Sequence, residues 1–330
     1  MATTSPTRAQ LAPVESATRI SLKAQSLKAQ LLDAGFDPYR ACGLRLLSLW
    51  HLTSLDAPTV AAVWTLAFAR AAGVRLPLWV PVMLALCAWS VYIGDRLLDA
   101  YRAIRDSHTS DSHNSIENGM RDLRPRHYFH WEYRRILLPV SIASAIGAVA
   151  LIVYLMPLAA RERNSLFAVG TLAYFTSVHS PWRFSTQRFR IPKELLVGIL
   201  FTLACVLPAW ARMPANLSER WTLLTPVAIF IGLAWLNCEA IENWESGVRW
   251  ERRFSIFRLA VALCVCAAIA ASITAALHEQ RIALLLIGAM FAAGLTAVLD
   301  RNAMRLAPTT LRALADLVLL APVLIGVFLP

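Results

Sequence analysis

Charged residues are scarce in this chain of 330 residues, where Asp, Glu, Lys and Arg together make up only 16%. Hydrophobic residues make up 57%, which is too much for a soluble domain of this length and normal for a protein that crosses a membrane several times. The six cysteines form no Cys-x-x-Cys pair of the kind that metal sites use, so we interpret them as small apolar side chains. Residues 1–48 lack the apolar core of a signal peptide, so the first apolar span must itself direct insertion.

Long apolar runs, by contrast, are abundant. A membrane-spanning helix needs roughly 20 mostly apolar residues. Nine windows of this kind follow one another along the chain: 55–72, 76–94, 135–157, 164–180, 193–211, 221–241, 254–277, 281–299 and 311–329. The sequence therefore predicts an all-α fold, a polytopic membrane protein in which residues 49–330 form a bundle of about nine transmembrane helices around a central cavity. We expect the polar, basic residues 1–48 to form a flexible cytoplasmic tail.

Lys and Arg are distributed unevenly between the connections. Positive charge is retained on the cytoplasmic side of a membrane protein. With nine spans, 25 of the 32 Lys and Arg residues fall on the side of the N-terminus and only 7 on the other side. This bias predicts a multi-pass protein with a cytoplasmic N-terminus and a C-terminus on the opposite side. The net charge of +11 then describes a face apposed to anionic lipid, so we expect the lipid bilayer as a partner and no nucleic acid.

A first group of acidic residues ends the second window, in SVYIGDRLLDAYRAIRD. Asp95 and Asp99 lie one helical turn apart on a common face, where two carboxylates can share a divalent cation. Arg96 and Arg102 stand close by on the same helix. Taken alone, this segment is equally well interpreted as a helix end that emerges into water with ordinary surface charges.

A second acidic group ends the sixth window, in LAWLNCEAIENWESGVRWERR. Its Glu residues are spaced by three and spread over one flank of a helix. Mg²⁺ takes oxygen ligands, typically one or two carboxylates with water and substrate phosphates. We therefore predict Mg²⁺ at the cytoplasmic mouth of the cavity, where it would bind a diphosphate head whose isoprenoid tail enters the apolar interior. The predicted metal ligands are Asp95, Asp99, Asn237, Glu239, Glu242 and Glu245, of which Asp95, Asp99 and Glu242 are also the predicted catalytic residues.

Basic residues should complete a diphosphate site. The connection after the fourth window supplies several of them in SPWRFSTQRFRIPKELLVG. The positive-inside rule explains each of these charges about as well. The predicted diphosphate ligands are Arg96, Arg102, Arg183 and Lys193.

These motifs and their layout resemble the UbiA-type intramembrane prenyltransferases, over residues 49 to 330. That family has nine helices, a cytoplasmic N-terminus and two Asp-rich motifs after spans two and six. VYIGDRLLD matches the first motif, Asn-Asp-x-x-Asp-x-x-x-Asp, either with Asp95 and Asp99 on its last two acids or, one turn along, on its first Asn and middle Asp. In place of the second motif, Asp-x-x-x-Asp, this chain has only Asn and Glu. LDAPT and PKELLVG are similar to the starts of the first and fifth helices of the family.

The resemblance implies an enzyme that ionises an isoprenoid diphosphate with Mg²⁺ and transfers the prenyl group to a hydrophobic acceptor. A minority of the family cyclises the cation instead, which would make the chain a membrane terpene cyclase. A non-catalytic membrane protein or a transporter is the alternative from another class. Transporters tend to place their carboxylates near the bilayer midplane beside broken helices, whereas these acids lie at span ends, which favours the enzyme.

Several other ionisable residues are given structural interpretations. We interpret Asp56 as a cap for the first span rather than a ligand. Asp300 and Asp316 resemble interfacial ion-pair partners. The histidines of the long second connection have irregular spacing, so we interpret them as solvated loop residues without a role; they are His108, His113, His127 and His130.

Overall fold

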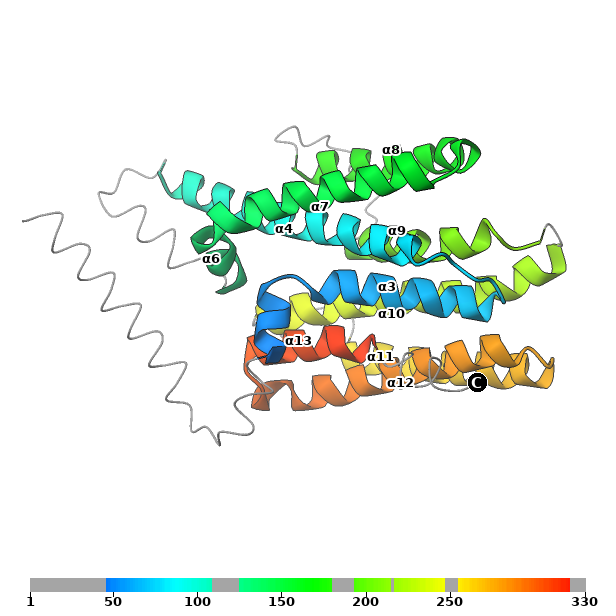
Figure 1. Ribbon diagram of the computed structural model, residues 1–330. Coiled ribbons are helices and arrows are strands. Elements are labelled where there is room, and N and C mark those ends of the chain that lie inside the picture. The colour runs from blue at the N-terminus through cyan, green and yellow to red at the C-terminus, as the bar shows by residue number, and fades with distance from the viewer. Residues whose placement is uncertain (1–45, 109–124, 180–192, 215–216, 247–254, 321–330) are drawn as a thin grey trace, which may run out of the picture. The chain divides into compact units, whose positions relative to one another are not determined.

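The computed structural model describes residues 46–108, 125–179, 193–214, 217–246 and 255–320 (Figure 1). The chain divides into two units, Met1–Leu47 and Ser48–Pro330, and nearly all described residues belong to the second. The predicted tail, residues 1–48, therefore lies outside the described residues apart from its last three.

Every regular element in these ranges is helical. A short helical segment, Leu46–Leu52, comes first. The helices that follow are α3 (Asp56–Ala71), α4 (Trp79–His108), α6 (Pro125–Glu132), α7 (Arg134–Leu155), α8 (Leu158–His179), α9 (Lys193–Trp210), α10 (Leu217–Ser246), α11 (Ile256–Ala276), α12 (Gln280–Asn302), the 3₁₀ turn η2 (Ala303–Arg305) and α13 (Pro308–Val318). The predicted all-α fold is confirmed for the described ranges.

Six described helices are long and apolar enough to cross a membrane, namely α4, α7, α9, α10, α11 and α12. The segment Leu46–Leu52 and α3 meet at 90° and give a seventh if this bent pair is one span. Helices α8 and α13 overlap the fourth and ninth predicted windows but do not meet the same criteria over their described residues. The apolar helices are consistent with a multi-pass membrane protein.

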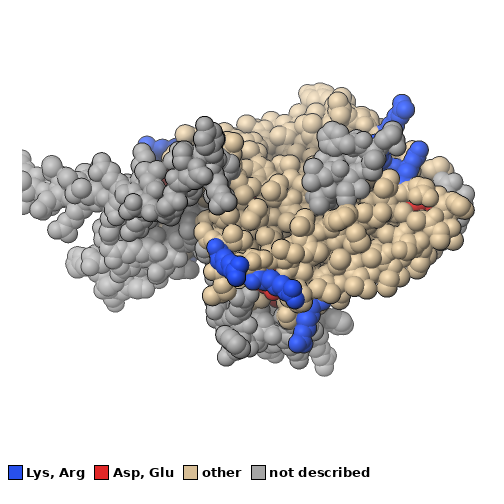
Figure 2. Space-filling model, turned by 90° about the horizontal axis from the view of Figure 1, so that it is seen from below, with Lys and Arg blue, Asp and Glu red and all other residues tan. Residues whose placement is uncertain are grey.

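Two of these helices expose large apolar side chains at intervals of three or four residues, which places the side chains on one face of each helix. They are Ile142, Ile146, Val149 and Val153 of α7, and Val261, Val265, Ile269 and Ile273 of α11. In Figure 2 most of the visible described surface is uncharged, and Lys, Arg, Asp and Glu are limited to a few patches. Continuous apolar stripes of this kind suit contact with lipid and not with water.

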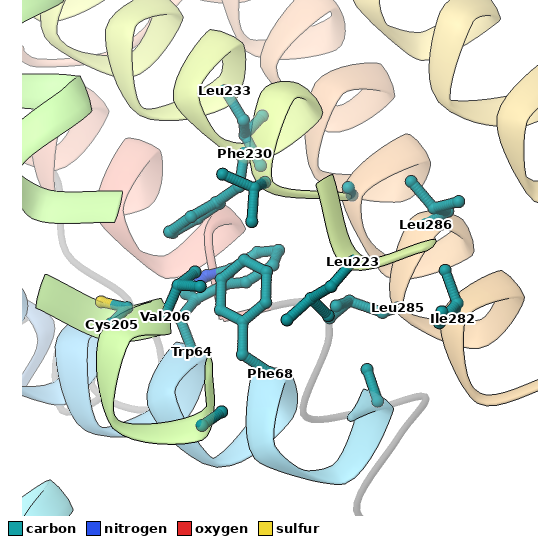
Figure 3. Close-up of a cluster of buried hydrophobic side chains, with 14 of the residues drawn as sticks. Trp64, Phe68, Cys205, Val206, Leu223, Phe230, Leu233, Ile282, Leu285 and Leu286 are labelled. Carbon is teal, nitrogen blue, oxygen red and sulfur yellow. The ribbon is translucent and has the colours of Figure 1, made fainter. Parts of the chain in front are cut away.

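The interior is centred on α3, which packs against α4, α9, α12 and α13 and meets α10 through aromatic rings. Trp64 stacks on Phe230 of α10 with ring centroids 3.8 Å apart, and Phe68 meets the same ring edge-on at 5.6 Å (Figure 3). All three side chains are almost fully buried. The Trp64 indole N–H donates to the carbonyl oxygen of Leu319, 2.7 Å away, so its one polar atom is satisfied inside the core.

Helices α9 and α10 approach closely at Gly198. A Cβ atom at this position would lie 3.0 Å from the backbone nitrogen of Trp235 and 3.3 Å from the carbonyl oxygen of Ile231. These are backbone atoms, which move only with their helix. A small residue at this point therefore sets the spacing of the two helices, as is common in membrane proteins.

Candidate functional site

A buried polar cluster lies where the chain turns into α3. The segment Leu46–Leu52 ends in a turn in which Ser54 has a φ of +58°, an uncommon backbone conformation for a residue other than glycine. The turn is held from α4 by Trp89, whose indole N–H donates to the carbonyl oxygen of Thr53 over 2.9 Å. It turns the side chains of His51 and Ser54 inward, where both are buried.

Asp56, the first residue of α3, is the centre of the cluster. Its Oδ2 atom lies 2.7 Å from Nδ1 of His51, and its Oδ1 atom accepts the backbone N–H of Ala57 at 2.9 Å. Both His51 and Asp56 are buried to about the same extent, with 2% of each side chain exposed. Asp56 is not the N-cap residue, as the sequence suggested, because Leu55 holds that position without a side-chain hydrogen bond; Asp56 accepts one first-turn N–H from inside the helix.

Arg96 of α4 enters the cluster from the other side and is 3% exposed. Its Nη1 atom donates to the carbonyl oxygen of His51 at 3.1 Å and to Oγ of Ser54 at 2.6 Å. Its Nη2 atom lies 3.7 Å from Oδ2 of Asp56 and has no hydrogen-bond partner. One nitrogen of this predicted diphosphate ligand thus fixes the turn, while the other faces the carboxylate of Asp56.

Asp316 of α13 and Asn237 of α10 complete the cluster. The Asn237 amide nitrogen donates to Oδ1 of Asp316 at 3.0 Å, while its own Oδ1 atom is buried without a hydrogen-bond partner. Ligand atoms of His51, Asp56 and Asp316 all lie within 4.8 Å of one another. Residues from the turn and from α3, α4, α10 and α13 therefore meet in one place, although they are far apart in the sequence.

One predicted loop histidine belongs to this region. His130 lies in α6, is fully buried, and its Nε2 atom is 3.0 Å from Oγ of Ser54. The interpretation of the four histidines as solvated is therefore wrong for His130. His127 is half-buried, and the side chains of His108 and His113 lie outside the described residues.

The predicted magnesium ligands are placed as follows. Asp95 and Asp99 are both half-buried on α4, as are Glu239 and Glu242 on α10. Within the described ranges, the only group of three or more His, Cys, Asp or Glu side chains close enough to share an ion is His51, Asp56 and Asp316. The acids of α4 and α10 are therefore not brought into one such group. The side chain of Glu245 lies outside the described residues.

The remaining predicted diphosphate ligands are more exposed than Arg96. Arg102 is half-buried on α4. Lys193 begins α9, and its Nζ atom lies 3.7 Å from Oε1 of Glu194 with 70% of the lysine side chain exposed. Arg183 lies outside the described residues. Asp300, interpreted as an interfacial ion-pair partner, is buried and accepts the indole N–H of Trp244 at 2.8 Å.

The charge of the cluster sets what it can do. The three charged groups named above, Asp56, Asp316 and Arg96, carry a formal charge of −1 when His51 is neutral. An unbalanced charge away from water is costly. One more proton or another cation beside these groups would balance it, which is the chemistry of a proton store or a cation site.

Two members of this cluster had a signal in the sequence. An ionisable residue inside an apolar segment is by default a functional hypothesis. Asp316 in LRALADLVLL and Asp56 in LDAPTVAAVW both satisfy that rule. No pattern along the chain, however, indicated that His51 and Arg96 would join them.

Comparison with known proteins gives no relative, since no family model, curated protein or solved structure matches the chain.

Proposed function

We propose that the protein is a magnesium-dependent membrane prenyltransferase, which ionises an isoprenoid diphosphate and transfers the prenyl group to a lipid-soluble acceptor. The observation that carries the proposal is one flank of α4. There Asp95 and Asp99 lie one turn apart and half-buried, while Nη2 of the neighbouring Arg96 is buried, lies 3.7 Å from Asp56 and has no hydrogen-bond partner. Two carboxylates suit a hard cation, and a guanidinium N–H suits a phosphate oxygen.

The proposed topology follows from the distribution of charge. Nine spans surround a central cavity, with the N-terminus in the cytoplasm and the C-terminus on the opposite side. This arrangement puts 25 of the 32 Lys and Arg residues on the cytoplasmic face, where the acidic ends of α4 and α10 also lie. The diphosphate is then recognised at the cytoplasmic end of the bundle, and its tail lies among apolar side chains.

In the proposed reaction the C–O bond between the allylic carbon and the diphosphate breaks, and its electron pair leaves with the diphosphate oxygen. Mg²⁺ supplies electrostatic stabilisation of the charge that develops on the leaving group. The acceptor then forms a bond to the allylic carbon and loses a proton. Asp95, Asp99, Asn237, Glu239, Glu242 and Glu245 hold the cation, and Arg96, Arg102, Arg183 and Lys193 donate to the diphosphate.

A terpene cyclase uses the same ionisation. In that case a double bond of the substrate attacks the allylic carbon, and the product is a cyclic hydrocarbon formed without an acceptor. The two activities differ only in the group that attacks the allylic cation, so the identity of the product distinguishes one from the other.

A transporter is the second candidate, and one observation favours it. Two features of ion-coupled transporters occur together here: the 90° break between Leu46–Leu52 and α3, and a cluster of ionisable residues beside it, in which His51 and Asp56 are buried and Asp316 is half-buried. Coupled transport would use the proton or cation that the cluster needs for neutrality.

Incubation of the purified protein in lipid nanodiscs with radiolabelled C10, C15 and C20 diphosphates, with Mg²⁺ or with EDTA, tests the proposal. We expect diphosphate release that requires Mg²⁺ and falls at least about 100-fold in Asp95→Asn and in Asp99→Asn, because each carboxylate helps to hold the metal. Glu162→Gln removes an exposed carboxylate from α8 and serves as the matched control. Release that is absent, or equal in all four proteins, would exclude the enzyme. A cyclic hydrocarbon formed without an acceptor would assign the cyclase.

A further inference from the structure

We propose that His51, Asp56, Asp316 and Asn237 form a site for a divalent transition-metal ion, separate from the magnesium ligands on α4 and independent of prenyl transfer. Asn237, whose amide contacts Asp316, is then a ligand of this ion and not of Mg²⁺. Transition metals bind nitrogen and oxygen ligands at about 2.0–2.2 Å, so two ligands of one ion are at most about 4.4 Å apart. The ligand atoms of His51, Asp56 and Asp316 lie within 4.8 Å of one another. Shifts of a few tenths of an ångström would let all three bind the same ion.

The fourth ligand is indicated by an independent observation, the side-chain oxygen of Asn237. Asn237 is 7% exposed, its nitrogen donates to Asp316, and its Oδ1 atom has no hydrogen-bond partner. An amide oxygen is only an acceptor, so it needs a donor or a cation. A buried acceptor that has neither is destabilising. A cation held between the carboxylates and this amide satisfies it.

Charge supports the same assignment. The two carboxylates and Arg96 leave a formal charge of −1 with neutral His51, and neutral imidazole is the form that binds metals. Arg96 anchors the backbone carbonyl of His51 and Oγ of Ser54. These bonds fix the backbone that carries the imidazole, while Nδ1 of the ring lies beside Asp56. Arg96 is therefore a positioning residue for the site.

The ligand chemistry narrows the choice of ion. One imidazole nitrogen, two carboxylate oxygens and one amide oxygen suit Zn²⁺, Mn²⁺ or Fe²⁺. Mg²⁺ and Ca²⁺ prefer sites made of oxygen alone. The imidazole thus separates this site from the proposed magnesium ligands, which are all oxygens, and gives it a spectroscopic signature of its own.

The experiment uses the full-length protein, purified in detergent, stripped with EDTA and loaded with Mn²⁺ or Zn²⁺. Metal content after desalting is measured by mass spectrometry, and electron spin-echo envelope modulation of bound Mn²⁺ detects a directly coordinated nitrogen. We expect one retained ion per chain, nitrogen modulation in the wild type, and a metal affinity at least about tenfold lower in His51→Gln and in Asp316→Asn. Saturating metal should raise the melting temperature by about 5 °C.

Two control variants separate loss of the metal ligands from loss of any other carboxylate. Asp300→Asn removes a buried carboxylate that accepts the indole N–H of Trp244, and it should retain the metal. Asp95→Asn should keep the nitrogen modulation even if it abolishes diphosphate release, so the two proposals fail separately. No retained ion, or equal retention in His51→Gln and Asp316→Asn, would overturn the site. If those variants do not fold, wild-type Mn²⁺ without nitrogen modulation would overturn it as well.

Discussion

The two halves of α3 have opposite surroundings, although they belong to one helix. Its first residue, Asp56, lies among His51, Arg96 and Asp316, where hydrogen bonds and charge hold the elements together. Two turns later Trp64 lies in an apolar core, which ring stacking and side-chain packing stabilise.

Helix α10 and the C-terminal region make the same change along their length. Helix α10 places Phe230 in the core and Asn237 in the polar cluster. The C-terminal region provides Asp316 to the cluster and the carbonyl of Leu319 to the indole of Trp64. The comparison shows that apolar packing stabilises one end of these helices, whereas charges and hydrogen bonds dominate the other end. The core should therefore tolerate no change of volume, whereas the cluster should tolerate no change of charge.

The largest effect is expected from the core. Phe230→Ala should lower the free energy of unfolding by about 4 kcal/mol, because it removes a ring that contacts both Trp64 and Phe68 and leaves a cavity. Reversible unfolding in mixed detergent and SDS measures this. Ile146→Ala, at an exposed position on α7, is the matched control and should change the value by less than about 0.5 kcal/mol. Equal losses for both variants would show that the core is not packed as described.

The next effect tests the polar end. Arg96→Met should lower the free energy of unfolding by about 3 kcal/mol, since it leaves the buried carboxylate of Asp56 without its guanidinium. Adding Asp56→Asn should restore part of the loss, because the unpaired charge is then gone. A double variant as unstable as the sum of the two single variants would contradict the charge argument. The same unfolding assay compares all three proteins.

A smaller effect is expected between the two regions. Gly198 contacts the part of α10 that runs from the core to the cluster, and its missing Cβ lets the backbones approach. Gly198→Val should cost about 2 kcal/mol through overpacking. Gly170→Val on α8, where a Cβ would meet nothing within 4 Å, is the control and should cost clearly less. Equal costs would mean that the spacing of α9 and α10 does not depend on this glycine.

The smallest effect concerns a hydrogen bond inside the core. Trp64→Phe removes the indole N–H that donates to Leu319 but keeps an aromatic ring. We expect a loss of about 1 kcal/mol, the usual net value of such a hydrogen bond, in thermal unfolding of the detergent-solubilised protein. A loss as large as that of Phe230→Ala would mean that this hydrogen bond stabilises the core as much as the packing of the Phe230 ring does, which would contradict the account.

Hydrophobicity predicted the apolar part of the molecule well. The windows around Trp64, Phe230 and the exposed stripe at Ile146 coincide with α3, α10 and α7, because burial in lipid or in the core demands the same apolar runs. The spacing of Asp95 and Asp99 on one helix was likewise predictable, since it depends only on local geometry.

The polar cluster was not predictable in the same way. His51 precedes Asp56 by five residues, and only the turn at Ser54 brings their side chains together. Asp316 is far from both residues in the sequence and lies near them because α13 packs against α3 and α10. No periodicity in the sequence indicates this packing. His130 was assigned to solvent because the spacing of the loop histidines is irregular, yet it is fully buried on α6. Contacts between elements distant in the sequence determine which residues meet in the cluster, and the spacing of residues along one sequence does not show those contacts.

The most direct measurement of the proposed chemistry is positional isotope exchange. Isoprenoid diphosphate labelled with ¹⁸O at the C–O bridge is incubated with the protein and Mg²⁺, and the recovered substrate is analysed by ³¹P NMR alongside free diphosphate. If α4 supports ionisation, the label moves from the bridge to non-bridging positions or diphosphate is released. Either event should require Mg²⁺, disappear in Asp95→Asn and persist in Glu162→Gln. Substrate recovered with its label in place and no diphosphate released, for the C10, C15 and C20 chains alike, would contradict the proposal.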